Sequence, residues 1–155
     1  MMKKEEYQQI LNDLCAEYNL VPIEVIFDAE KLTKKESGGQ YNWHLGDYGT
    51  IVIDPSLEQE GIDLLEVLFH EFRHYWQRMY FPDIFFWWCC ESNGLYKKYY
   101  NTILCSIEED ARVFGETRGA SNRCDLLEMY DVETLSSLRD DERILHLTLQ
   151  FLELE

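Results

Sequence analysis

The feature that most constrains this sequence is a long helical stretch in which apolar residues cover most sides. Between Leu64 and Trp76 most positions are apolar, which predicts a helix that is largely buried and runs to about Tyr80. Upstream, Ser56 with Gln59 three residues later is typical of a capping box and predicts the start of this helix. Ionisable groups inside such a helix need compensation, because burying an unpaired charge is costly.

The residues from His70 to His74, in the middle of this helix, match the pattern HExxH. Two His at i and i+4 lie about one turn apart on one face, so both imidazoles can bind a single metal ion. Glu71 points toward the same cleft and can act as a general base. A divalent metal would compensate these buried groups. The alternative is a partly exposed helix with solvated imidazoles and with Glu71 paired to Arg73 or Arg78.

The first third of the chain predicts a helix followed by a small sheet. Residues 3–19 carry apolar side chains at helical spacing. Residues 21–27 and 41–45 alternate as strands do, and residues 31–40 between them read as a loop. The β-branched run 50–53 predicts a third strand, paired with the second as a hairpin. The expected fold is therefore a minimal α+β domain, mostly helical, with a short three-stranded sheet preceding the HExxH helix.

Composition limits the class of protein. A chain of 155 residues is sized for one compact domain, expected over residues 1–155. Its net charge of −16, from 30 Asp and Glu against 14 Lys and Arg, disfavours nucleic acids and anionic membranes as partners. Five Cys without a CxxC pair and a charged N-terminus predict a cytoplasmic protein. The longest apolar stretch, residues 81–90, is about half the ~20 residues that a membrane span needs.

A catalytic zinc ion needs a third protein ligand besides the two His. Gln77 and Tyr80 stand where a metzincin would have Gly and His, so the third ligand must come from elsewhere. A second long helix is expected over residues 96–116. On it, Glu108 lies beside the apolar stripe, which makes it the preferred ligand.

Small residues on the same helix face support Glu108. Ala111 and Gly115 follow it at i+3 and i+7 and would let the second helix approach the HExxH helix closely. Glu109 is turned about 100° further round the helix and is the fallback ligand. Asp110 could instead hydrogen-bond a ligand imidazole.

These two segments together resemble the gluzincin arrangement of HExxH zinc metallopeptidases. HEFRHYWQ is followed, 34 positions after His74, by EEDARVFG. The pair is most similar to the compact ImmA/IrrE-like group, whose second motif is E-x-x-A with a following aromatic and a small residue. The resemblance covers residues 50–116, and Arg73 departs from it because relatives often have a small residue there. The resemblance implies a zincin-like fold in which His70, His74 and Glu108 are the zinc ligands. It also implies that Glu71 is the general base.

The chemistry expected of such a site is amide hydrolysis. Zinc polarises a peptide carbonyl and lowers the pKa of water, while Glu71 takes up a proton and passes it to the leaving amine. The expected substrate is a peptide or protein, and the acidity of the chain favours one with basic residues. Donors for the developing oxyanion are left open among Tyr96, Tyr99, Tyr100, His44 and Arg112.

Other readings of the sequence are kept beside this one. The chain could be a catalytically silent zincin-fold protein that acts as an acidic protein-binding adaptor or inhibitor, although such a protein has no chemical need for Glu71. A DNA mimic would leave the HExxH pattern unexplained. The aromatic run 85–88 is expected in the core rather than as a substrate-binding wall. Cys89, Cys90 and His146 receive no role, and the oligomeric state is left open.

Overall fold

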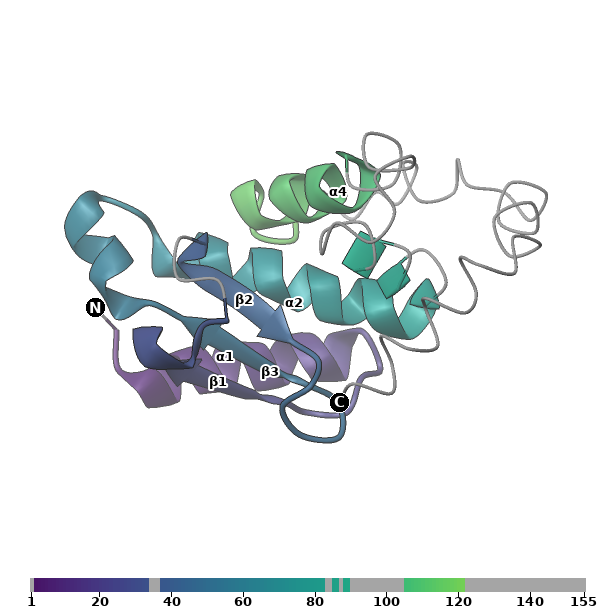
Figure 1. The fold of residues 1–155 in the computed structure, drawn as a ribbon, viewed down its shortest axis with the longest axis horizontal. Coiled ribbons are helices and arrows are strands. Elements are labelled where there is room, and N and C mark those ends of the chain that lie inside the picture. The colour runs from purple at the N-terminus through teal and green to yellow at the C-terminus, as the bar shows by residue number, and fades with distance from the viewer. Residues whose placement is uncertain (1, 34–36, 83–84, 87, 90–104, 122–155) are drawn as a thin grey trace.

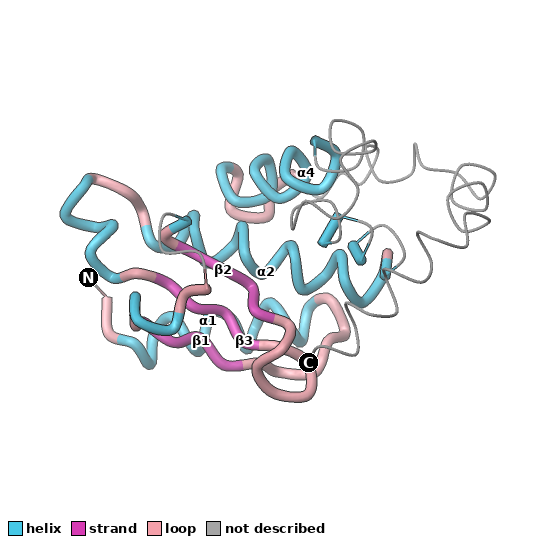
Figure 2. The backbone as a smooth tube through the Cα atoms, in the orientation of Figure 1, coloured by secondary structure: helices cyan, strands magenta, loops and turns pink. Residues whose placement is uncertain are grey.

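The computed structural model describes residues 2–33, 37–82, 85–86, 88–89 and 105–121 (Figure 1). Its elements, in chain order, are helices and strands of ordinary length with two short 3-10 helices between them (Figure 2). They are α1 (Lys4–Glu17), β1 (Glu24–Phe27), η1 (Ala29–Lys31), β2 (Gly39–Asn42), β3 (Thr50–Ile53), η3 (Pro55–Glu60), α2 (Leu64–Tyr80) and α4 (Cys105–Glu116).

The three strands form one sheet in the order β1-β3-β2. The central strand β3 pairs in parallel with β1, where Val25 is opposite Ile51, and antiparallel with β2, where Tyr41 is opposite Ile51. All four residues of β3 are buried, as expected for a β-branched run in the middle of a sheet. The predicted α+β class and the hairpin between the second and third strands are confirmed.

The predicted bounds of the second strand are wrong. β2 begins at Gly39, inside the segment that we expected to be a loop, and ends three residues before Leu45. The chain turns early because the side chain of Asn42 accepts a hydrogen bond from the amide of His44 at 3.0 Å. Gly39 suits a strand packed tightly on α2, since a Cβ there would lie 2.6 Å from Cγ1 of Val67. β1 is also shorter than its alternating pattern suggested.

The start predicted for the HExxH helix is wrong as well. Asp54 caps the 3-10 helix η3 by accepting from the amide of Ser56 at 2.9 Å. Gly61, with φ of 83°, ends that helix in the left-handed region. α2 begins only after this break, where Asp63 accepts from the amide of Leu65 at 2.9 Å. The pattern at Ser56 therefore marks a separate turn of helix.

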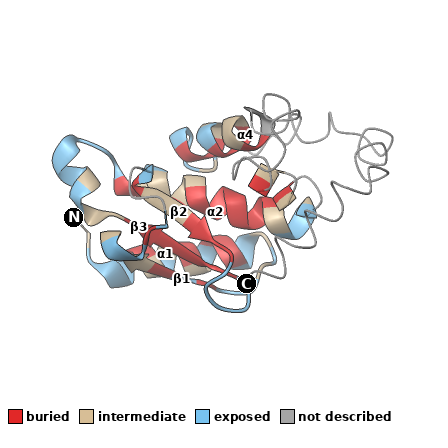
Figure 3. Cartoon of the chain, viewed as in Figure 1, coloured by how far each residue is buried: buried red, intermediate tan, exposed pale blue. Residues whose placement is uncertain are grey.

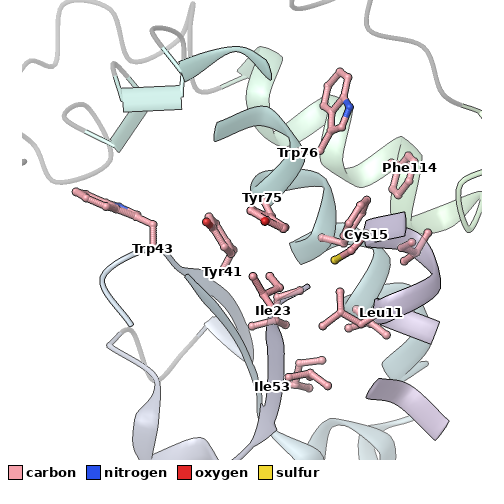
Figure 4. Packing of buried hydrophobic residues seen from close by; sticks show 14 of the residues in the cluster. Leu11, Cys15, Ile23, Tyr41, Trp43, Ile53, Tyr75, Trp76 and Phe114 are labelled. Carbon is pink, nitrogen blue, oxygen red and sulfur yellow. The ribbon is translucent and has the colours of Figure 1, made fainter. Parts of the chain in front are cut away.

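Helix α2 lies at the centre of the described structure and ends at Tyr80, as predicted. It packs against β2, β3, α1 and α4 (Figure 3). Its C-terminal half is tied to the link between α1 and β1, because the hydroxyl of Tyr75 donates to the carbonyl of Val21 and that of Tyr80 to the carbonyl of Tyr18, each at 2.7 Å. Helices α1 and α2 pack on the same side of the sheet (Figure 4). The buried hydrophobic cluster includes Leu11, Cys15, Ile51, Leu68, Phe72 and Phe85.

Some predictions fall outside the described residues. The helix predicted over residues 96–116 is described from Cys105 and ends at Glu116, as expected. Its earlier part, Trp87, Cys90 and the C-terminal segment with His146 lie outside the described residues. The burial of Phe85 agrees with a core role for the aromatic run. Within the described ranges, no helix is both long and apolar enough to cross a membrane.

Helices α2 and α4 approach closely at small residues. Ala111 is fully buried, and a Cβ added to Gly115 would lie 2.9 Å from the carbonyl oxygen of Glu66 and 3.1 Å from Cβ of His70. Gly115 contacts the first half of α2, while the carbonyl of Ile107 accepts a hydrogen bond from the second half. The two helices therefore run antiparallel, in contact at the small-residue face that the sequence predicted.

Because of this contact, we expect Gly115→Ala to lower the free energy of unfolding by about 1–3 kcal/mol. Helix propensity alone would act in the opposite direction, by about 1 kcal/mol in favour of Ala. Urea unfolding of both proteins measures the difference. A variant as stable as the wild type would show that separating the helices costs no more than the gain of about 1 kcal/mol from helix propensity.

Candidate metal centre

Helix α2 supplies the two imidazoles of the site. His70 and His74, one turn apart, place their ring centroids 5.1 Å from each other. The side chain of His74 is 4% exposed and that of His70 is 25% exposed. One imidazole is therefore enclosed by protein, while the other lies at the edge of the site.

Helix α4 brings Glu108 to these rings. Its Oε1 lies 3.1 Å from Nε2 of His74 and its Oε2 lies 3.5 Å from Nε2 of His70. One ligand atom from each of the three residues lies within 4.8 Å of the others, so the cluster could hold a metal ion. Two imidazole nitrogens and a carboxylate oxygen are a donor set that suits zinc. The side chain of Glu108 is 43% exposed, which leaves this side of the cluster accessible.

Glu71, the expected general base, is held by strand β2. Its Oε2 accepts a hydrogen bond from the backbone amide of Tyr41 at 2.8 Å, in a buried position. A Cβ on Gly39 would lie 2.6 Å from Cγ1 of Val67, one turn before Glu71, so the absence of a side chain there lets the strand come this close. Arg73 and Arg78, the partners considered for Glu71, bond Asp110 and the hydroxyl of Tyr41 instead.

A buried polar network lies behind the imidazoles. The guanidinium of Arg73 donates to both oxygens of Asp110, at 2.7 and 3.1 Å, and each of these side chains is 1% exposed. Gln77 donates to the same carboxylate at 2.8 Å and to the carbonyl of Ile107 at 3.0 Å. Its Oε1 lies 2.7 Å from Nδ1 of His74. Asp110 thus reaches a ligand imidazole through Gln77 rather than directly.

The electrostatics of the cluster favour a charged pair in the absence of a cation. Burial alone would keep His74 neutral, but the carboxylate of Glu108, with smaller contributions from Glu71 and Gln77, raises the pKa of His74 to about 9. Partial burial likewise opposes ionisation of Glu108, yet the charge of His74 and hydrogen bonds from both imidazoles hold the pKa of its carboxyl well below the usual range. A proton on His74 therefore competes with a metal ion.

The other residues considered for the site lie elsewhere or outside the described part. Glu109 forms an exposed salt bridge with Arg112, which also bonds Glu116 at 2.7 Å, so neither is aimed at the cluster. The ring of His44 stacks on Trp43, with centroids 4.0 Å apart. The three Tyr considered as oxyanion donors, at positions 96, 99 and 100, lie outside the described residues.

Three contacts of the site were not foreseen from the sequence. Gln77 was noted only as a departure from the metzincin pattern, although a polar residue inside an apolar helix could have pointed to it. The amide of Tyr41 gives no sequence signal, because any residue but Pro has one. Trp88 stacks on His74 with ring centroids 4.7 Å apart and covers one face of the imidazole.

Adjacent carboxylates allow a matched test of the third ligand. We expect Glu108→Ala to weaken Zn²⁺ binding by more than about 100-fold, because a ligand contributes more than the residues that orient it. Glu109→Ala removes the neighbouring carboxylate and should leave affinity within about twofold. Competition with a chromophoric chelator measures both. Unchanged affinity in Glu108→Ala, with or without a loss in Glu109→Ala, would exclude Glu108 as the ligand.

The raised pKa of His74 predicts that zinc affinity rises with pH, about tenfold per unit below about 9, because the proton must leave before the metal binds. In the metal-free protein, the free energy of unfolding changes with pH in the opposite direction. The charged imidazole stabilises the fold fully below the ordinary value of 6.5, and this contribution is lost as the pH rises through about 9. Chelator competition and urea unfolding at several pH values measure the two trends. Zinc affinity that does not change with pH would contradict the charged pair.

Comparison with known proteins identifies no relative. No protein-family model, curated protein or solved structure matches this chain. What the protein does has to be argued from the side chains themselves, namely two imidazoles and a carboxylate that could hold a metal ion, with a second carboxylate fixed beside them.

Proposed function

We propose that this protein is a zinc-dependent peptidase of gluzincin type. The observation that carries the proposal is the convergence of His70, His74 and Glu108 from two helices onto one cluster of ligand atoms. Two His and one Glu form the ligand set of a catalytic zinc site, which keeps a further position for water or substrate. The exposure of Glu108 and His70 on one side of the cluster supports such an open position.

The chain's own residues would divide the work of hydrolysis. Zinc, when bound, polarises a peptide carbonyl and makes water a better nucleophile. Glu71 would accept the proton of the attacking water and deliver it to the leaving amine. The amide of Tyr41 fixes one oxygen of Glu71 at 2.8 Å, so the carboxylate is oriented and its other oxygen is left for the proton. A base that is already oriented lowers the entropy cost of the proton transfer and so raises the rate.

The substrate class and the setting are also proposals. Among the described residues at the cluster, Glu71 and Glu108 contribute negative charge, and the whole chain carries −16. A peptide or protein with basic residues near the cleaved bond would be attracted to this surface. Cys15 is a free, buried cysteine, which supports a reducing compartment such as the cytoplasm. The ImmA/IrrE-like group remains the family we propose.

Replacing the proposed base tests the activity. We expect Glu71→Gln to lower the rate of peptide cleavage by about 10²–10⁴-fold, because the amide cannot accept a proton. Zinc affinity should change little, since Glu71 is not a ligand. A library of internally quenched peptides, half of them with Lys or Arg, provides the assay, and mass spectrometry identifies the products.

Glu66→Gln is the matched control for this experiment. Glu66 lies on the same helix but is exposed, so its replacement should leave cleavage unchanged. If zinc-loaded wild type and Glu71→Gln behave identically toward every peptide, the peptidase proposal is wrong. A protein that binds zinc and basic partners without cleaving them would then match the adaptor alternative.

A further inference from the structure

We propose that Gln77 is a positioning residue that fixes the proton of His74 on Nδ1 and so directs Nε2 to the metal. This inference deepens the proposed function and rests on the same site. Gln77 lies one turn after His74 on α2, with its whole side chain buried. Its amide connects the ligand imidazole to helix α4 through hydrogen bonds of 2.7 to 3.0 Å.

The orientation of the Gln77 amide is determined by two groups that can only accept. The carbonyl of Ile107 lies 3.0 Å from Nε2, and Oδ2 of Asp110 lies 2.8 Å from the same atom. A carbonyl and an ionised carboxylate have no hydrogen to donate, so the NH₂ group must face them. Turning the amide by 180° would place its oxygen against two acceptors. The Gln77 oxygen therefore faces His74.

This orientation in turn decides the protonation of the imidazole. Because Oε1 of Gln77 only accepts, Nδ1 of His74 must donate across the 2.7 Å between them. In the neutral ring the other nitrogen, Nε2, then carries the lone pair. Nε2 is the atom that lies 3.1 Å from Oε1 of Glu108, on the side of the metal cluster. Glu108 is an acceptor as well and favours a proton on Nε2 until a metal ion takes that position, so Gln77 supplies the partner for the Nδ1 proton that the metal-bound ring keeps.

Asp110 can play this part because Arg73 holds it in place. The guanidinium occupies both carboxylate oxygens and is stacked over the ring of Trp76, 3.6 Å from its centroid. Arg73 stands where zincins of similar motif often have a small residue. Arg73 therefore positions Asp110, Asp110 orients the amide of Gln77, and Gln77 orients the imidazole of His74. Because the Gln77 amide is neutral, it adds no negative charge beside Glu71 and Glu108.

Nitrogen NMR of the wild-type protein tests the tautomer without any variant. In protein loaded with ¹¹³Cd²⁺, ¹⁵N shifts should show a proton on Nδ1 of His74, and the one-bond coupling to cadmium should appear on Nε2. Coupling through Nδ1, or a bound ring without the Nδ1 proton, would overturn the proposal.

The variant Gln77→Met keeps the length of the side chain and removes the amide. We expect it to weaken Zn²⁺ binding about 10–100-fold, the usual effect of losing a group that orients a ligand imidazole. In its cadmium-loaded form, part of the coupling should move from Nε2 to Nδ1 of His74. Gln9→Met on the exposed face of α1 is the matched control and should change neither quantity. Unchanged zinc affinity and tautomer in Gln77→Met would also overturn the proposal.

A double-mutant cycle separates positioning from general stability. Asp110→Asn should weaken zinc binding in the wild-type background, because an Asn amide can turn a donor toward Gln77 and release its orientation. In the Gln77→Met background the same change should weaken binding by a smaller factor than in the wild type. Losses that simply add would show that Asp110 does not act through Gln77.

The proposed function and this inference fail in different ways. Zinc-loaded wild type that cleaves no peptide contradicts the peptidase but leaves the tautomer and the zinc affinities to be measured. A wild type that binds neither Zn²⁺ nor Cd²⁺ contradicts both proposals. Cleavage by wild type together with the wrong tautomer would leave the peptidase and remove the inference.

Discussion

The ion pair between Arg73 and Asp110 sets the position of α4 on α2, and the candidate metal site depends on that position. Removing two charges from water costs several kcal/mol per ion, which only good geometry and additional hydrogen bonds offset. Both are present here, with two bonds from Arg73, a third from Gln77, and aromatic rings of Trp76 and Phe114 against the guanidinium. A slip of one helical turn, about 5.4 Å, would break all of them and carry Glu108 out of a cluster whose ligand atoms lie within 4.8 Å.

The same helix contact explains why three elements are needed for one site. Two imidazoles on α2 cannot by themselves complete a metal site, because successive turns offer only one face. α4 adds the carboxylate of Glu108 where Gly115 and Ala111 permit close approach. β2 approaches α2 at Gly39, and the neighbouring amide of Tyr41 fixes Glu71. Ligand and base are therefore oriented by separate neighbours of one buried helix.

The features that could be predicted from the sequence are those that depend on neighbouring residues in the chain. The end of α2 and the strand β3 depend on local periodicity, which the sequence displays directly. The contact of His70 and His74 on α2 with Glu108 depends on the small residues of α4, which the sequence also displays. The bounds of β2 could not be predicted, because the side chain of Asn42 and the packing of Gly39 decide them. The part played by Gln77 was hidden for a similar reason. Its partners, Ile107 and Asp110, lie 30 or more positions away in the chain.

The charges of the site show how proton and metal exclude each other. Asp110 is balanced by Arg73, so the carboxylates that face the ligand position are those of Glu71 and Glu108. A proton on His74 offsets one of these negative charges and is held with a pKa of about 9. A divalent cation would offset both, but it needs the nitrogen that this proton occupies. Because Gln77 already holds the proton on Nδ1, metal binding has to displace only the one on Nε2, and the imidazole need not turn.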